Sequence, residues 1–156
     1  MIESSNKIID PAPGCEIVTT RVINAARELV YKAWTNPVHL KKWWGPNGFT
    51  NTFHEFDLRE DGRWSFIMHG PDKKNYPNES IFLKIIENEF LAFNHISDPR
   101  FQVQAIFKEI SAGKTEVTFK MVFNTVEECT KIKAFVAGKN EENMDRLEAE
   151  LLSMSL

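Results

Sequence analysis

Residues 115–124 are TEVTFKMVFN, a stretch in which apolar and polar side chains alternate along the chain. Such alternation is typical of a strand that buries one face and exposes the other to water. The segment long enough to cover the buried face is 141–154, whose apolar residues recur at helical spacing. We therefore predict a curved antiparallel sheet wrapped around one long C-terminal helix. The covered face of this strand would carry Val117, Phe119, Met121 and Phe123.

The segments before this stretch favour six more strands and two short helices. Residues 16–24 are rich in β-branched side chains, which is typical of a strand. Two helices are expected next, at 25–35 and 38–44, because Asn36-Pro37 ends the first and suits the start of the second. Short turns between the later strands indicate an antiparallel meander, so the fold class is α+β with seven strands. These later strands are expected at 49–58, 63–69, 79–87, 90–97 and 101–110.

The chain of 156 residues has the length of one globular domain, and no linker or repeat divides it. Residues 1–14 are rich in proline near their end and show no periodicity. This pattern predicts a flexible N-terminal arm at 1–14, followed by a single domain at 15–156. The C-terminal part is expected to be helical from Val126 and to falter near Gly138.

The charge balance and the residue counts exclude several classes of partner and site. The chain has 19 basic and 22 acidic residues, so we expect no nucleic-acid partner. No apolar run approaches the ~20 residues that cross a bilayer, and no signal peptide is evident. We therefore expect a cytoplasmic protein without a membrane span. The two cysteines and four scattered histidines exclude a zinc cluster, and we expect neither a metal nor another cofactor.

The register of one hairpin can be predicted from its own residues. A three-residue loop at 60–62, with Gly62 in the left-handed region, gathers apolar residues on one face. The same loop places Glu55 and Asp57 on the other face, where their carboxylates avoid a costly burial. His54 would then point inward. The expected pairs are Leu58 with Trp64, Phe56 with Phe66 and His54 with Met68.

Four motifs follow one another in order along the chain. They are Trp43-Trp44-Gly45-Pro46, Arg59-Glu60-Asp61-Gly62-Arg63-Trp64, Met68-His69-Gly70-Pro71-Asp72 and Tyr76-Pro77-Asn78-Glu79. In this combination the chain resembles the activator of Hsp90 ATPase homologue 1-like family, which belongs to the START/Bet v 1-like (SRPBCC) superfamily. The resemblance extends from about Cys15 to Met154. It implies the helix-grip fold, with a deep cavity between the sheet and the C-terminal helix that often holds lipids or other apolar ligands.

Two positions depart from the pattern of that family. Asp61 stands where relatives commonly have a second glycine, and Met144 stands where many carry a bulky tryptophan or leucine on the long helix. Whether the cavity is open or filled at Met144 therefore stays undecided at this point. The co-chaperones that gave the family its name also have an N-terminal domain for binding the chaperone, for which we expect no room here.

The aromatic composition suits a large apolar interior, because twelve Phe and four Trp accompany only two Tyr. We expect the protein to capture an apolar small molecule or lipid in the cavity between the sheet and the helix, without catalysis. His54 and His95 would orient the ligand by hydrogen bonding, unless the protein itself satisfies them or the ring is exposed. The expected ligand-binding residues are Trp44, His54, Phe56, Trp64, Phe66, Met68, Phe93, His95, Phe107, Phe119, Met121, Met144 and Leu147.

Three alternative functions remain open. A co-chaperone-like interaction module, with a chaperone contact inferred from the family resemblance alone, would need an exposed apolar or charged patch. A cofactor-free cyclase or hydrolase of the same superfamily would need His54 or His95 beside an acidic or basic partner. A structural protein would have a filled interior. The acids on the outer face of the long helix are expected to be solvated, and they are Glu141, Glu142, Asp145, Glu148 and Glu150.

Overall fold

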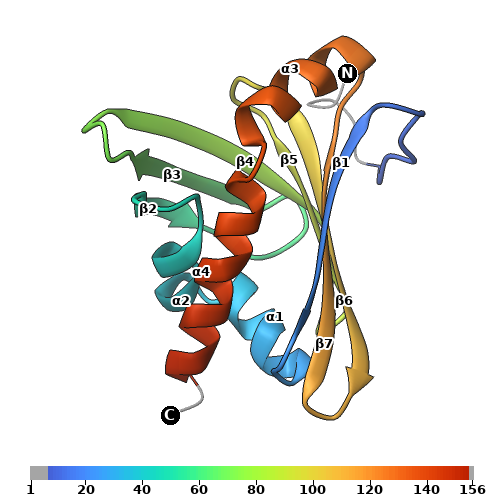
Figure 1. The fold of residues 1–156 in the computed structure, drawn as a ribbon. Helices are drawn as coiled ribbons and strands as arrows, with labels where there is room; N and C mark the ends of the chain where they lie inside the picture. The colour runs from blue at the N-terminus through green and yellow to red at the C-terminus, as the bar shows by residue number, and fades with distance from the viewer. Residues whose placement is uncertain (1–6, 155–156) are drawn as a thin grey trace.

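The computed structural model describes residues 7–154 and shows a seven-stranded antiparallel sheet curved around helices (Figure 1). The strands are β1 (Glu16–Ile23), β2 (Thr50–Phe56), β3 (Arg63–His69), β4 (Asn75–Ile86), β5 (Phe90–His95), β6 (Phe101–Ser111) and β7 (Lys114–Val122). The helices are α1 (Arg27–Thr35), α2 (Pro37–Trp43), α3 (Val126–Val136) and α4 (Lys139–Met154). The strand order is β1-β7-β6-β5-β4-β3-β2. This architecture confirms the predicted helix-grip fold, although β4 begins at Asn75 instead of residue 79.

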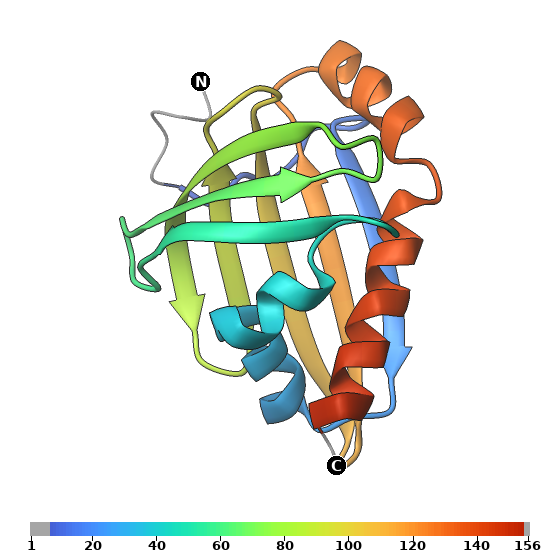
Figure 2. The same ribbon diagram turned by 90° about the vertical axis from the view of Figure 1, so that its left-hand side faces the viewer.

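The helices lie on the concave side of the sheet. Figures 1 and 2 show α1 and α2 together near one end of the long strands, whereas α3 lies at the opposite end. The long helix α4 runs between these two ends, beside the edge strand β1. Strands β2, β3 and β4 curl across the long strands, so the interior is enclosed by the sheet on one side and by α4 on the other.

Local signals place the helix boundaries. The side chain of Asn36 accepts a hydrogen bond from the backbone N–H of Val38 at 3.0 Å, and Pro37 occupies the first turn of α2. The side chain of Thr125 caps α3 through a backbone N–H in the same way. Gly138 has a φ angle of 78°, a conformation that suits glycine, and it separates α3 from α4 at the predicted position.

The end of the interior beside α1 and α2 is filled by large side chains. Trp34 of α1 and Trp43 of α2 pack with 4.9 Å between their ring centroids. The indole N–H of Trp43 donates to the carbonyl of Ala33 at 2.9 Å. This half of the interior is therefore close-packed, as is usual for a protein core. The same core contains Trp64, Phe107, Met144 and Leu147, each of which is buried.

The hairpin of β2 and β3 differs from the predicted register. Phe56 pairs with Trp64, and Phe53 pairs with Phe66, because a β-bulge at His54 inserts one extra residue between these pairs. His54 is exposed, so the prediction that it points inward is wrong. The bulge allows Phe53 and Phe56 to pack together against the core, although they are three positions apart.

The turn of this hairpin also differs from the prediction. Asp61 has the positive φ angle, 67°, instead of Gly62. Gly62 is required for another reason, since a Cβ atom there would lie 1.9 Å from the carbonyl oxygen of Asp57. The N–H of Asp61 donates to the carbonyl of Phe82, and the N–H of Phe82 donates to the carbonyl of Gly62, each at 2.9 Å. The turn is therefore joined to β4.

The N-terminal segment contacts the outer face of β6. The side chain of Gln102 donates to the carbonyl of Lys7 at 3.1 Å and accepts from the N–H of Ile9 at 2.9 Å. The side chain of Gln104 donates to the carbonyl of Ile9 at 2.8 Å. These contacts bury two amide side chains on a face that we expected to be largely wet. Residues 1–6 of the predicted arm lie outside the described residues.

The substitution Met144→Trp should lower the free energy of unfolding by about 1–3 kcal/mol, because an indole would overpack a core in which Met144 has no exposed surface. Urea denaturation of the variant and the wild type measures the change. Leu152→Trp is the matched control, since Leu152 lies on the same helix and is 72% exposed; it should shift this free energy by less than about 0.5 kcal/mol. Unchanged or higher stability of Met144→Trp would show that open space reaches this position.

Candidate functional site

A cavity of about 410 Å³ lies between the sheet, α3, the start of α4 and the segment that follows α2. Most of its lining side chains are apolar, and its lining within residues 7–154 includes no Asp, Glu, Lys or Arg. The strands and the turn before β6 contribute Phe66, Met68, Asn78, Ser80, Phe93, His95, Pro99, Phe101, Val103, Phe119 and Met121. The other lining residues are Trp44, Gly45, Pro46, Ile132, Phe135, Val136, Asn140 and Asn143.

The cavity brings together part of the predicted ligand-binding set. The residues from that set which line it are Trp44, Phe66, Met68, Phe93, His95, Phe119 and Met121. We expected a deep cavity between the sheet and the long helix and left open how far it is filled; Trp34 and Trp43 occupy one half of the interior. The predicted residues that lie outside the cavity are Trp64, Phe107, Met144 and Leu147, which are buried in the core, Phe56, which packs against it, and His54, which is exposed.

The lining residues that we did not predict from the sequence include residues of α3 and β4. Ile132 and Val136 of α3 are one helical turn apart, a spacing that places both on one face of the helix. Phe135 is 73% exposed, so this part of the lining is at the solvent boundary. Asn78 and Ser80 of β4 are two positions apart and share the concave face of the sheet. The polar character of these two positions concealed them, because polar residues in a strand usually indicate its wet face.

One polar part of the cavity lining lies where β4 and β5 pair. Ser80 is opposite His95 in the register of the two strands. The His95 ring is within 2.7 Å of the carbonyl oxygen of Pro99 through Nδ1, and within 2.7 Å of the side-chain oxygen of Asn78 through Nε2. By contrast, the Ser80 hydroxyl is buried and has no hydrogen-bond partner among the described residues. The wall of the cavity therefore contains a hydroxyl that is available to a bound molecule.

His95 is shielded from water, and this burial determines its protonation. Burial lowers the pKa of His95 below its ordinary value of 6.5, against smaller opposite effects of hydrogen bonds at Pro99 and Ser97. Oxygen atoms near both ring nitrogens would suit a protonated ring, but the charge would have to reside in an apolar wall. We therefore expect the ring to be neutral at neutral pH.

Acidification should destabilise the protein through His95. The pKa of His95 is lower in the folded chain, so as the pH falls below about 6.5 the unfolded chain takes up a proton that the folded chain does not. The free energy of unfolding should therefore decrease in this range, and urea denaturation at a series of pH values should show a weaker decrease for His95→Gln. His54→Gln is the control, since His54 is exposed and should leave the wild-type dependence in place. A pH dependence of His95→Gln equal to that of the wild type would contradict this assignment.

Arg146 of α4 holds the segment that follows α2. Its guanidinium donates to the carbonyl oxygens of Lys42, Gly45, Pro46 and Phe49, at distances of 2.8–2.9 Å. Burial lowers the pKa of Arg146, but an arginine remains charged at neutral pH. Hydrogen bonds from a charged donor are stronger than those between neutral groups. This side chain therefore fixes one wall of the cavity against α4.

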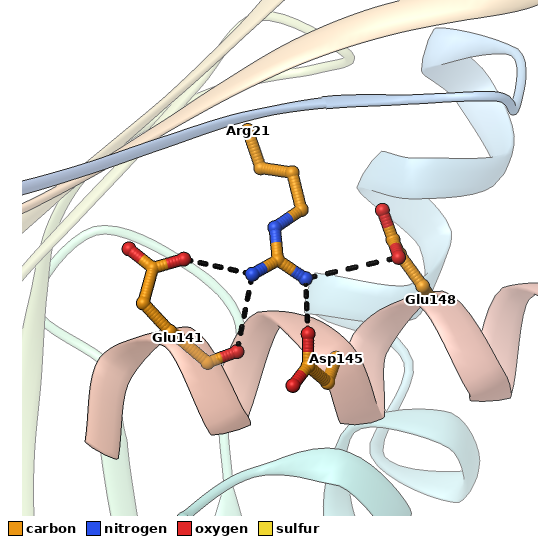
Figure 3. Close-up of polar contacts among 4 residues, drawn as sticks. All are labelled: Arg21, Glu141, Asp145 and Glu148. Atoms are coloured by element: carbon orange, nitrogen blue, oxygen red, sulfur yellow. Dashed lines mark hydrogen bonds and ion pairs between the residues drawn. The ribbon is translucent and has the colours of Figure 1, made fainter. Parts of the chain in front are cut away.

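A second arginine joins α4 to the sheet. Arg21 of β1 points at the helix and bonds to Glu141 at 2.7 Å and to Asp145 at 2.5 Å (Figure 3). A carboxylate oxygen of Glu148 lies 3.7 Å from the same guanidinium. These three acids are exposed, as we expected, but we did not predict their contacts with an arginine. All three face a single basic residue on the edge strand.

Two further acids of α4 contact the region around α2. Glu150 is buried, and its carboxylate lies 2.7 Å from Nδ1 of His39. The carboxylate of Glu142 accepts a hydrogen bond from the backbone N–H of Asn47 at 3.0 Å. These contacts and those of Arg146 join α4 to α2 and to the segment after it. The predicted solvated face of α4 is thus an interface with two other parts of the fold.

The substitution Arg146→Met should lower the free energy of unfolding by about 2 kcal/mol, because backbone carbonyls lose a charged donor while the apolar stem is kept. Urea denaturation measures the loss. Arg59→Met is the matched control, since the Arg59 side chain is 73% exposed and bonds across its own turn to Asp57. The control should stay within about 0.5 kcal/mol of the wild type. An equal effect of the two substitutions would mean that the contacts of Arg146 contribute nothing beyond those of a surface arginine.

The other nucleophilic and metal-binding side chains form no second site in the part of the chain that the structure describes. Cys15 and Cys129 are buried free thiols. Burial raises the pKa of Cys129, which disfavours the reactive thiolate. Across residues 7–154, no three His, Cys, Asp or Glu side chains are grouped so that they could hold a metal ion. Within the same residues, no helix has both the length and the apolar character that crossing a membrane requires.

Similar proteins share the sequence pattern and the fold. The family model described as "Activator of Hsp90 ATPase homolog 1-like protein" matches residues 24–151. A crystal structure of a protein from Nitrosomonas europaea is similar at a TM-score of 0.85 and 20% identity, over 92% of this chain and 98% of that one. A crystal structure of a protein from Rhodobacter sphaeroides is similar at a TM-score of 0.81 and 20% identity, over 94% of this chain and 98% of that one. A solution structure of a protein from Arthrobacter aurescens is similar at a TM-score of 0.83 and 18% identity, over 90% of this chain and 87% of that one. Comparison with curated proteins gave no match.

Proposed function

The chain belongs to the activator of Hsp90 ATPase homologue 1-like family, and we propose that it binds an apolar small molecule or lipid in its cavity, without catalysis. The observation that carries this proposal is the cavity itself, with a volume of about 410 Å³ and a mainly apolar lining. Small-molecule sites commonly measure about 300–1,000 Å³ and combine apolar walls with a few polar groups. Burial of apolar surface would contribute roughly 25 cal/mol per Å² to the binding free energy.

The composition of the wall suits occupants of more than one shape. Phe66, Phe93 and Phe119 provide flat apolar surfaces, whereas Met68 and Met121 have flexible thioether side chains. Such methionines adapt to irregular molecular surfaces, because their rotatable bonds allow the sulfur and methyl group to move. A binding site of this kind can therefore accommodate a chain or a ring system of suitable volume.

A cyclase or hydrolase activity receives less support from the site. His54 lies outside the cavity, and His95 is occupied by contacts with Pro99 and Asn78. The described lining supplies no carboxylate, ammonium or guanidinium group to act with a histidine as a general acid or base. These observations favour binding over catalysis. A chaperone contact and a cytoplasmic location stay predictions from the sequence and the family resemblance.

Titration of the protein with Nile red, a neutral apolar dye, should show saturable binding with increased fluorescence. Ile132→Trp should weaken this binding by at least about tenfold, because Ile132 is half-buried and lines the cavity, so that an indole there would occupy the space of the dye. Ala134→Trp is the matched control on the same helix, since Ala134 is exposed and does not line the cavity. The control should bind the dye like the wild type.

The outcomes of this titration separate the cavity from nonspecific surface binding. Saturation at one dye per protein, lost in Ile132→Trp and kept in Ala134→Trp, would support the proposed site. Equal weakening in both variants would place the dye elsewhere on α3. An absence of saturable binding to the wild type, by Nile red and by other apolar probes of similar size, would overturn the proposed function.

A further inference from the structure

We infer that the cavity selects an occupant with an uncharged hydrogen-bonding group, such as a hydroxyl or carbonyl, and that Ser80 binds this group. The inference rests on the proposed function, which it makes more specific. Ser80 lies on the concave face of β4, between Trp64 of β3 and His95 of β5 in the strand register. It lines the cavity, and its side chain is fully buried.

The hydroxyl of Ser80 has no hydrogen-bond partner among residues 7–154, unlike the side chains of His95 and Asn78 beside it. His95 contacts the carbonyl of Pro99 and the side-chain oxygen of Asn78. The side-chain nitrogen of Asn78 donates to the carbonyl of Tyr76 at 2.7 Å. A buried hydroxyl without a partner destabilises the folded state, because it loses its hydrogen bonds to water. An oxygen atom of a bound molecule would restore such a bond.

The surroundings of Ser80 determine which kind of group can reach it. The described lining contains no Lys or Arg, so a carboxylate at this depth would lose its hydration without gaining a counter-charge. The rings of Phe93 and Phe66 make the adjacent wall apolar. A hydroxyl or carbonyl loses much less hydration free energy on burial than a carboxylate does. The site should therefore favour a neutral polar group over an anionic one on the same hydrocarbon chain.

The experiment compares decanol with decanoate, which share a hydrocarbon chain and differ in charge, as competitors of Nile red at neutral pH. Decanol should compete more strongly than decanoate for the wild-type protein, after correction for the affinity of the dye. Ser80→Ala should weaken decanol binding by about fivefold, the loss expected for one neutral hydrogen bond, and leave decanoate unchanged. Ser111→Ala is the matched control, since Ser111 is exposed at the end of β6 and outside the cavity.

Thermal unfolding of the ligand-free variants provides a second, independent readout. Ser80→Ala removes a buried hydroxyl that has no partner, so its melting temperature should equal or exceed that of the wild type. A lower melting temperature with unchanged decanol binding would overturn the inference, because the hydroxyl would then bond within the protein. The indole N–H of Trp64 would be the candidate partner, since it is also buried and unpaired among the described residues.

The remaining outcomes distinguish the inference from the proposed function. If Nile red binds and decanoate competes as strongly as decanol does, the selection of a neutral group is overturned and the proposed function stays intact. Binding of Nile red with no competition by either molecule would overturn the inference in the same way. Failure of Nile red and of both molecules to bind at all would overturn the proposed function itself.

Discussion

The guanidinium of Arg146 joins the long helix to the segment that connects α2 with the sheet. It is the common donor for carbonyls at the end of α2 and in the segment that leads to β2. That segment includes Gly45 and Pro46, which line the cavity, so the same contact positions one cavity wall. Arg21 holds α4 to the edge strand β1 through Glu141 and Asp145. Two arginines thus connect the helix to the edge of the sheet and to the segment after α2.

Much of the fold could be predicted from the sequence because the alternation in β7 shows which face of the sheet is buried. The alternation around Phe119 requires a covered sheet, and a polar face on α4 requires that this helix cover it with its other side. The register of the β2–β3 hairpin was harder to predict, because a strictly alternating pattern leaves no place for an additional, bulged residue in one strand. Phe53 and Phe56 are three positions apart and both pack inward, which is possible only with a bulge at His54. The spacing of those two aromatic residues was the sequence signal from which the bulge could have been predicted.

The candidate site was only partly predictable, because periodicity indicates which face is inward and not how far the space in front of it is filled. Phe107 and Phe119 lie on inward faces of adjacent strands, yet only Phe119 lines the cavity. Trp34 of α1 packs against both rings, and Tyr31 of the same helix also packs against Phe107. Periodicity could not identify Ser80 as a lining residue either. A polar residue on a concave face is recognised only when the pairing of its strand with the neighbouring strands is known.

The two halves of the interior have opposite effects on stability. Close packing around Trp34 and Trp43 stabilises the fold, since it buries large apolar surfaces. The cavity and the unpaired Ser80 hydroxyl both destabilise the fold. Atoms that face the open space lack packing contacts, and the buried hydroxyl lacks the hydrogen bonds that it would make in water. A protein with a purely structural role would gain stability by filling the second half as it fills the first. The cavity lies at the end beside α3, with exposed Phe135 at its edge, and this open space is therefore an argument that this end is shaped by binding.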